Sequence, residues 1–334
     1  MGALQLIKAE TEMRTDVMAK SSAIDYDVDQ GGKLQAVVKG SHYGLTPHSE
    51  GQIYSRTGVP KMYADKLMGL KEGELLKENL RTMTRRTMED GVLVRRVGTV
   101  VKGWLSPSYK RMDGSILFET FIDKVTKNGL VPYRGMNTDY RYQVSFIYPK
   151  VFTPAKNEAV TYGMSLMTGD YGDQSVELSM MVLRIICANL AIGLEMLRKI
   201  HLGARFKSEE EMIDFSRQTL ELDGRTVASA IGDVVDTGSK KIEYLDKKIR
   251  EASSKEVGKD QLKGALQDLR RKGIGKELTE KVGNLFNLDD VIELLPAGKS
   301  EWRLSNAISL VAQSAKSQDV RVDMEKSAMD ILLN

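Results

Sequence analysis

The sequence predicts an α+β protein, because two different hydrophobic periods occupy different parts of its 334 residues. Between Gly91 and Gly203 the pattern favours the element order β-α-β-β-β-α with an antiparallel sheet, and helical patterns lie before and after this stretch. The most strongly patterned part runs from Tyr162 to Gly203. There the apolar period changes from two residues to about 3.6 residues near Arg184, so we expect a β-hairpin followed by a long buried helix.

Each half of this central stretch has its own pattern. In the second strand of the hairpin, apolar residues alternate with mostly polar ones at Val176, Leu178, Met180 and Val182. Beyond Arg184 the apolar positions are three and four apart, as on one side of a helix, at Cys187, Leu190, Leu194 and Leu197. Gly203 follows the last of them and is expected to end the helix.

The chain divides into three parts by pattern. Residues 1–43 are weakly patterned, with one short strand-like run at 34–38, and we interpret them as an N-terminal arm. Residues 44–207 form the expected α+β core domain, which is also the candidate nucleic-acid-binding domain. Residues 208–334 are predicted to form a helical C-terminal region.

Three helices are predicted ahead of the sheet. Thr46 is a candidate N-cap with Pro47 at the first helical position, so a helix is expected over residues 47–56. Pro60 is expected to open a second helix over residues 60–68, and a third covers residues 72–88.

The elements of the sheet follow. Residues 91–106 are rich in β-branched side chains and are interpreted as one strand. Residues 115–129 are predicted to form a helix that ends at Asn128-Gly129. Tyr140, Tyr142, Val144 and Phe146 alternate with polar residues, which predicts a strand with one polar face.

Helical patterns dominate after residue 207. Ser208 to Glu211 is a capping box that is expected to open a helix through Leu222. A near-heptad apolar stripe, with Gly238 as its break, contains Val227, Ile231, Val235, Ile242, Leu245 and Ile249. Two further helical segments precede Pro296, and residues 301–313 and 319–333 supply two last helices.

Positive charge is concentrated in the first two thirds of the chain, although the net charge is only +3. Residues 1–207 contain 29 lysines and arginines against 22 aspartates and glutamates, whereas residues 208–334 contain 20 against 24. Such a division suits a domain that meets a polyanion, and it also occurs in proteins without such a partner.

Composition argues against several classes of function. A single cysteine, Cys187, excludes an internal disulfide, and three histidines without paired spacing argue against a zinc site. The motifs GxSxG, HExxH and CxxC are absent, and no apolar run approaches the roughly 20 residues that cross a bilayer. We therefore expect a cytosolic protein, neither an enzyme nor dependent on a cofactor or metal.

Arginines and tyrosines in the first two thirds are the candidates for binding nucleic acid, because guanidinium groups meet phosphates and rings stack on bases. The candidate phosphate contacts are Arg81, Arg85, Arg86, Arg95, Arg96, Lys102, Lys110, Arg111, Arg134 and Arg141. The candidate stacking rings are Tyr109, Tyr133, Tyr140 and Tyr142. Two plainer interpretations stay open: a solvated helix face for the row at Arg81 and Arg85, and ordinary cross-strand pairs for the tyrosines and arginines.

Several blocks, in order, carry a resemblance to a known family. GLTPHSEGQIYSRTGVPKMYADKLM, YKRMDGSILFETFID, VLRIICANLAIG and WRLSNAISLVAQ together resemble an uncharacterised phage- and plasmid-encoded domain family, over about residues 44–310. That resemblance implies a mobile-element origin and transfers no catalytic residue. The predicted β-β-β-α run is also similar in architecture to phage single-strand annealing proteins of the RecT, Erf and Red-beta type. This second similarity implies rings or filaments that hold single-stranded DNA in a basic groove.

The leading hypothesis is an oligomeric, ATP-independent protein of the host-cell cytoplasm that binds single-stranded DNA and promotes annealing in phage recombination. A competing hypothesis is a phage structural or host-interaction protein that assembles through its helical C-terminal region. A nuclease or antirestriction enzyme is the third hypothesis. It ranks last because its candidate carboxylates, Glu119 and Asp123, lie one helical turn apart but have no histidine or lysine partner in the sequence pattern.

Overall fold

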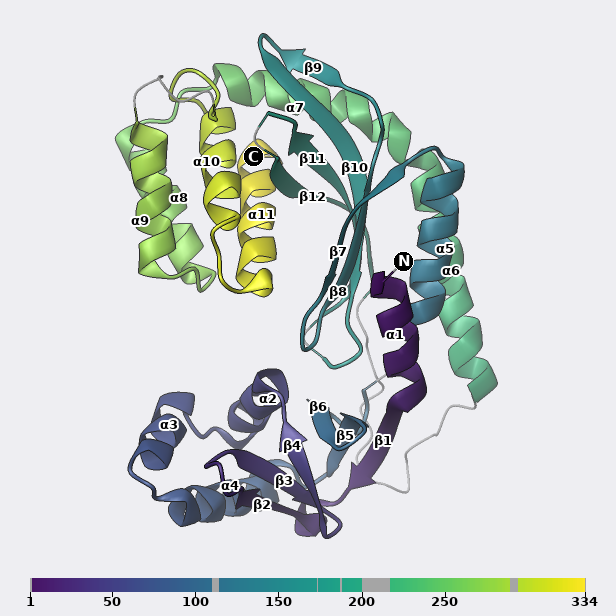
Figure 1. Ribbon diagram of the computed structural model, residues 1–334, viewed down its shortest axis with the longest axis vertical. Coiled ribbons are helices and arrows are strands. Elements are labelled where there is room, and N and C mark those ends of the chain that lie inside the picture. The colour runs from purple at the N-terminus through teal and green to yellow at the C-terminus, as the bar shows by residue number, and fades with distance from the viewer. Residues whose placement is uncertain are drawn as a thin grey trace.

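Two β-sheets with separate hydrophobic cores form the described part of the protein in its computed structural model (Figure 1). The structure describes residues 2–109, 114–172, 174–186, 188–199, 217–288 and 294–333. Helices pack against both sheets, which confirms the α+β fold class. We call the part that contains the first sheet the N-lobe and the part that contains the second sheet the C-lobe.

The N-lobe is a six-stranded sheet with the order β1-β5-β6-β4-β3-β2. Its strands are β1 (Arg14–Ala19), β2 (Ile24–Val28), β3 (Leu34–Val38), β4 (Ser41–Leu45), β5 (Val92–Val97) and β6 (Val100–Leu105). Its helices are α2 (Pro47–Thr57), α3 (Lys61–Gly69) and α4 (Gly73–Thr87), close to the three that the sequence predicts. Ile24, Ile53, Leu76 and Trp104 meet in its core.

The prediction of an N-terminal arm at residues 1–43 is wrong. This segment supplies helix α1 (Gly2–Met13), strands β1 to β3 and the start of β4. β1 pairs with β5 along its whole length, although about 75 residues of sequence separate the two strands. The strands are short and contain acids such as Asp25 and Asp27, so their hydrophobic pattern is weak. Because the sheet is completed by distant strands, local periodicity does not reveal it.

The C-lobe sheet has the order β12-β11-β10-β8-β7, with β9 paired to β10. Its strands are β7 (Val131–Asn137), β8 (Tyr142–Ile147), β9 (Phe152–Ala155), β10 (Glu158–Thr168), β11 (Val176–Arg184) and β12 (Asn189–Lys199). Its helices are α5 (Gly114–Lys127), α6 (Arg217–Gly238), α7 (Ile242–Ser254), α8 (Lys259–Arg271), α9 (Lys276–Asn287), α10 (Glu301–Ala312) and α11 (Gln318–Leu333). Figure 1 shows α5 and α6 on one side of the sheet and α10 and α11 on the other, with α1 beside α5.

The predicted long helix after Arg184 is also wrong, because β12 occupies this stretch and pairs antiparallel with β11. The register between the two strands shifts twice at Ser179, which leaves extra residues in β12. One of them, Leu194, has a φ of +52°. Such bulges convert the alternation of a strand into spacings of three and four, and these spacings resemble a helical period. Cys187 and Gly203 lie outside the described residues.

The single strand predicted over residues 91–106 proves to be a hairpin of β5 and β6, with a turn at Gly98, whose φ is +59°. The strand predicted at Tyr140 to Phe146 is confirmed as β8, and it pairs with β7, which precedes it in the chain. The helical prediction for the C-terminal region is confirmed for its described residues, with α6 ending at Gly238. The capping box at 208–211 lies outside them. No helix among the described residues is long and apolar enough to span a membrane.

Gly163 provides a test of the central strand pairing. A Cβ atom at this position of β10 would lie 2.1 Å from the Phe146 carbonyl oxygen and 2.7 Å from Met181 Cε. We expect Gly163→Ala to lower the free energy of unfolding by about 3 kcal/mol, measured by chemical denaturation. The control is Gly264→Ala in α8, where nothing lies within 4 Å of the new Cβ, and this change should stabilise by up to about 1 kcal/mol. Equal stability of both variants would contradict the pairing.

Candidate nucleic-acid interface

A cleft of about 810 Å³ lies between the two lobes. Helix α2 and the end of β6 form its N-lobe wall. The residue before β8, the β10–β11 connection, the start of β11, β12 and α11 contribute the C-lobe side. In Figure 1, α2 lies directly below α11 and the tip of the β7–β8 hairpin. The cleft is therefore built from segments that are far apart in the sequence.

The N-lobe wall follows from the local sequence of α2. Thr46 and Ser49 form a capping box, in which Ser49 N donates to Thr46 Oγ1 at 3.2 Å, and the helix ends before Gly58 in the left-handed conformation. One face of the helix buries Ile53 in the N-lobe core. Another face turns to the cleft with residues that are four apart, namely His48, Gln52 and Arg56.

A backbone carbonyl joins this helix to the C-lobe. The Tyr171 oxygen accepts hydrogen bonds from His48 Nε2 at 3.0 Å and Gln52 Nε2 at 2.8 Å. Gln52 Oε1 in turn accepts from Trp104 N at 2.7 Å. Gly172 follows with a φ of +82°, and a Cβ there would lie 2.8 Å from Gln52 Nε2. The glycine thus permits the close approach that fixes one side of the cleft.

The C-lobe side is mainly cationic. Arg141, Arg198 and Lys326 line it, and the only carboxylate among the described lining residues is Glu177. Lys326 Nζ forms a close ion pair with Glu177 Oε2, at 2.7 Å. Arg198 is 56% exposed, and its contact with a carboxylate is longer, at 3.7 Å between Nη1 and Glu195 Oε2. Together with Arg56, four cations face one carboxylate, so the cleft suits an anionic ligand.

Aromatic rings lie at the same place. His48 and Tyr140 are stacked, with their ring centroids 4.3 Å apart and an interplanar angle of 12°. The Arg141 guanidinium lies 5.1 Å from the Tyr140 centroid. Tyr109 also lines the cleft, and the buried Arg95 guanidinium lies 5.4 Å from its ring centroid. Burial raises the pKa of Tyr109, so its ring stays neutral at physiological pH.

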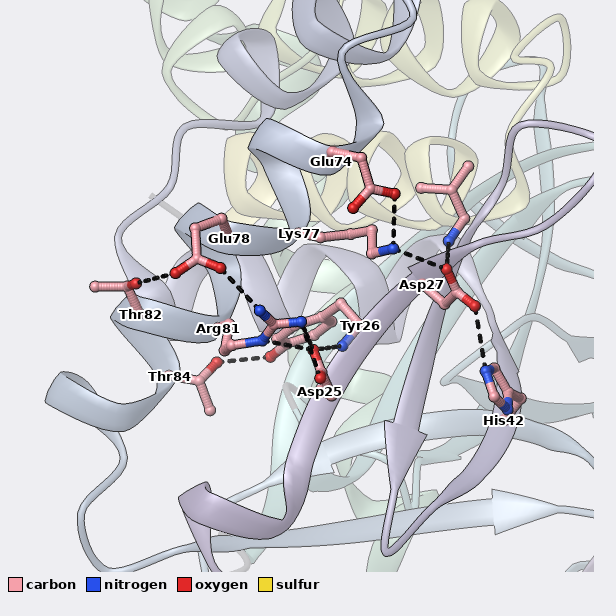
Figure 2. A network of polar contacts seen from close by, with 11 residues as sticks. Asp25, Tyr26, Asp27, His42, Glu74, Lys77, Glu78, Arg81, Thr82 and Thr84 are labelled. Carbon is pink, nitrogen blue, oxygen red and sulfur yellow. Dashed lines mark hydrogen bonds and ion pairs between the residues drawn. The ribbon is translucent and has the colours of Figure 1, made fainter.

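Most of the predicted arginines do not reach this cleft, and Arg81 is one example (Figure 2). Its guanidinium binds both oxygens of Asp25, with Nε to Oδ1 at 2.9 Å, and also Glu78. Partial burial raises the pKa of Asp25, but hydrogen bonds from Tyr26 N and from Arg81 outweigh it and hold that pKa below its usual range. Arg81 therefore joins α4 to β2 instead of facing a ligand.

Arg95 and Lys102 belong to a buried polar network at the junction of the lobes. Arg95 is 1% exposed and binds both oxygens of Asp16, at 2.8 and 3.0 Å. It also donates to the carbonyl oxygen of Asp170, while Lys102 pairs with Glu10 on α1. Both cations hold the two lobes and α1 together, so their prediction as phosphate contacts is not supported by their positions.

Two further arginines pair with acids of α11. Arg134 forms a two-pronged ion pair with the buried Glu325, at 2.7 Å for the Nη1–Oε1 contact. Arg141 lies 3.4 Å from Asp319 and 3.1 Å from Asp323, so these acids offset part of its charge although it lines the cleft. These pairs fasten the end of the chain to the C-lobe sheet.

The remaining candidates are dispersed. Arg96 lies over the Tyr43 ring, Tyr133 packs beside Met181, and Tyr142 is buried in the C-lobe core. Arg85 and Arg86 are exposed on α4, outside the cleft. Lys110 and Arg111 lie outside the described residues. Among the members of the predicted set that the structure describes, only Tyr109, Tyr140 and Arg141 lie at the cleft.

Sequence reasoning missed His48, Arg56, Arg198 and Lys326. His48, Gln52 and Arg56 follow one another at intervals of four residues. This spacing is visible in the sequence and could have identified one polar face of a short helix. No comparable signal exists for Arg198, because its segment resembled a helix, or for Lys326, which comes from the last helix. Their meeting is a property of the tertiary structure alone.

The two acids considered for a nuclease site are each paired with a lysine. Glu119 pairs with Lys8 and Asp123 with Lys127. Within the described ranges, no three His, Cys, Asp or Glu side chains come together as a metal site would require.

The fold and its cleft define an α+β protein of two lobes with a cationic site between them. Comparison of the chain with protein-family models, curated proteins and solved structures finds no match.

Proposed function

We propose that the protein binds single-stranded DNA in the cleft between its lobes and promotes strand annealing as an ATP-independent homo-oligomer in phage recombination. The observation that supports this proposal most is the convergence of four cations on a cleft with one described carboxylate. Lysine and arginine side chains along an open cleft are suited to bind the phosphate groups of a nucleic-acid backbone.

The rings at the cleft favour a single strand. A flexible strand presents both its phosphates and the faces of its bases, so it can use cations and aromatic rings together. Tyr109 and the stacked His48 and Tyr140 lie beside the cationic residues. In a duplex the bases are already stacked on one another, and these rings would have no base faces to contact.

The annealing and oligomeric parts of the proposal come from the sequence-based resemblance to phage single-strand annealing proteins. The structure does not reproduce the β-β-β-α run on which that resemblance was based, because β12 takes the place of the predicted helix. In such a scheme the protein carries no chemistry of its own, and the bases left outside the cleft pair with a second strand. The host-cell cytoplasm would be its place of action, since the phage DNA is recombined there.

A fluorescence anisotropy titration with a labelled single-stranded oligonucleotide tests the binding step. We expect binding that weakens as salt is raised, with a slope of about −0.7 in log K against log salt for each phosphate contact. A duplex of the same length should bind more weakly. Absence of binding to the single strand at about 0.1 M salt, within the range where such contacts remain strong, would reject the proposal.

A further inference from the structure

Glu177 occupies an unusual place in the cleft. It lies on β11, is 8% exposed, and is the only described carboxylate among the lining residues. Lys326 Nζ lies 2.7 Å from its Oε2, and Ser179 Oγ donates to its Oε1 at 3.1 Å. Its directly paired residue on β12 is Arg198. The carboxylate is thus held beside two of the four cations that line the cleft.

A second pocket of about 600 Å³ adjoins the cleft and shares Glu177, Arg198 and Lys326 with it. Beyond these three residues the second pocket contains three further acids, Glu195, Asp323 and Asp330, against one further cation, Lys272. Glu177 therefore lies at the border between a cationic region and an acidic one. An anionic strand is favoured only on the cationic side of this border.

We propose that Glu177 acts as an internal competitor for phosphate, which excludes isolated phosphate groups and lets the cleft accept only a polymeric anion. This inference rests on the proposed function and adds a selectivity to it. The ligands that Glu177 excludes are inorganic phosphate and mononucleotides. The ligand that overcomes it is an oligonucleotide.

The physical argument concerns what a phosphate must displace. A phosphate that takes Lys326 from Glu177 leaves a buried carboxylate without its ion-pair partner, and an unpaired buried charge is strongly unfavourable. One phosphate gains a single site in return. An oligonucleotide places several phosphates in the cleft at once, since its second and later contacts are intramolecular, and their sum offsets the same cost.

Substitution of the carboxylate by an amide tests this selectivity. Glu177→Gln keeps the shape of the side chain but removes the charge. Its amide oxygen can still accept from Lys326, and its NH2 group can donate to Ser179 Oγ. By calorimetry, we expect the wild-type protein to bind an oligonucleotide and to show no binding of inorganic phosphate or dTMP. The variant should bind the oligonucleotide about fivefold more tightly at about 0.1 M salt, which is the effect of one phosphate contact, and should also bind phosphate and dTMP.

The matched control is Glu277→Gln on α9, where an 81% exposed carboxylate pairs with Lys281 at 2.7 Å. This variant should bind every probe as the wild type does. If Glu177→Gln fails to fold, Glu177→Asp replaces it in the experiment. The shorter side chain keeps the charge but moves it away from Lys326, so we expect smaller increases in the affinities for the oligonucleotide, phosphate and dTMP.

The outcomes separate the two proposals. If the wild type binds the oligonucleotide but Glu177→Gln binds it equally or more weakly, Glu177 is no competitor and the inference is overturned while the proposed function stands. Binding of dTMP by the wild type overturns the inference in the same way. If neither protein binds the oligonucleotide, the proposed function itself fails.

Discussion

Arg95→Ala is expected to lower the free energy of unfolding by about 3–5 kcal/mol, the usual effect of removing one partner of a buried ion pair. Without Arg95, the Asp16 carboxylate and the Asp170 carbonyl oxygen lose the hydrogen bonds that this guanidinium donates at the junction of the lobes. Asp16 is 8% exposed, so water does not replace the lost contacts. Denaturation with urea, followed by circular dichroism, measures the change.

Arg85→Ala is the control for this experiment. Arg85 is exposed on α4. We expect its removal to change stability by less than about 0.5 kcal/mol. A stable Arg95→Ala protein that has lost its affinity for DNA would contradict the structural role assigned to Arg95 and would restore it as a phosphate contact.

The double variant Arg56→Ala/Arg198→Ala is expected to bind single-stranded DNA about 25-fold more weakly at about 0.1 M salt. Each lost phosphate contact is worth about fivefold between 1 M and 0.1 M salt, and the slope of log K against log salt should fall by about 1.4. The two residues line the cleft from opposite lobes, so the experiment asks whether one ligand uses both walls. Anisotropy titrations at four salt concentrations give the slope.

The matched control removes the same number of charges elsewhere. Arg85→Ala/Arg86→Ala takes two exposed arginines from α4, outside the cleft. We expect its affinity and its salt slope to stay close to those of the wild type. An equal loss of affinity in this variant would place the DNA on α4 and would reject the cleft as the binding site.

The sequence is a good guide to the helices of the N-lobe and a poor one to its sheet. Thr46-Pro47 and Gly58 mark α2 because caps and glycines act over a few residues. By contrast, β1 pairs with β5, a strand that is distant from it in the sequence. In β12 the bulges opposite Ser179 imitate a helical period. Pattern reasoning fails where pairing between distant segments determines the element.

The same limit applies to the binding site. Arg95 and Asp16 are 79 residues apart in the sequence, and Arg134 and Glu325 are 191 apart. An arginine that is held in such a pair is indistinguishable from a ligand-binding one until its partner is located in space. The count of arginines predicted a polyanion partner, but their contacts decide which of them can meet it.

The position of α10 and α11 on the C-lobe sheet has a consequence for the order of folding during synthesis. Strands β1 to β6 and their helices follow one another within residues 14–105, so the N-lobe sheet can assemble before the rest of the chain has been translated. The C-lobe must wait, because its sheet is covered by α10 and α11, which are translated after all the strands of both sheets. Lys326 arrives with α11, so the cleft is complete only after this helix has been translated.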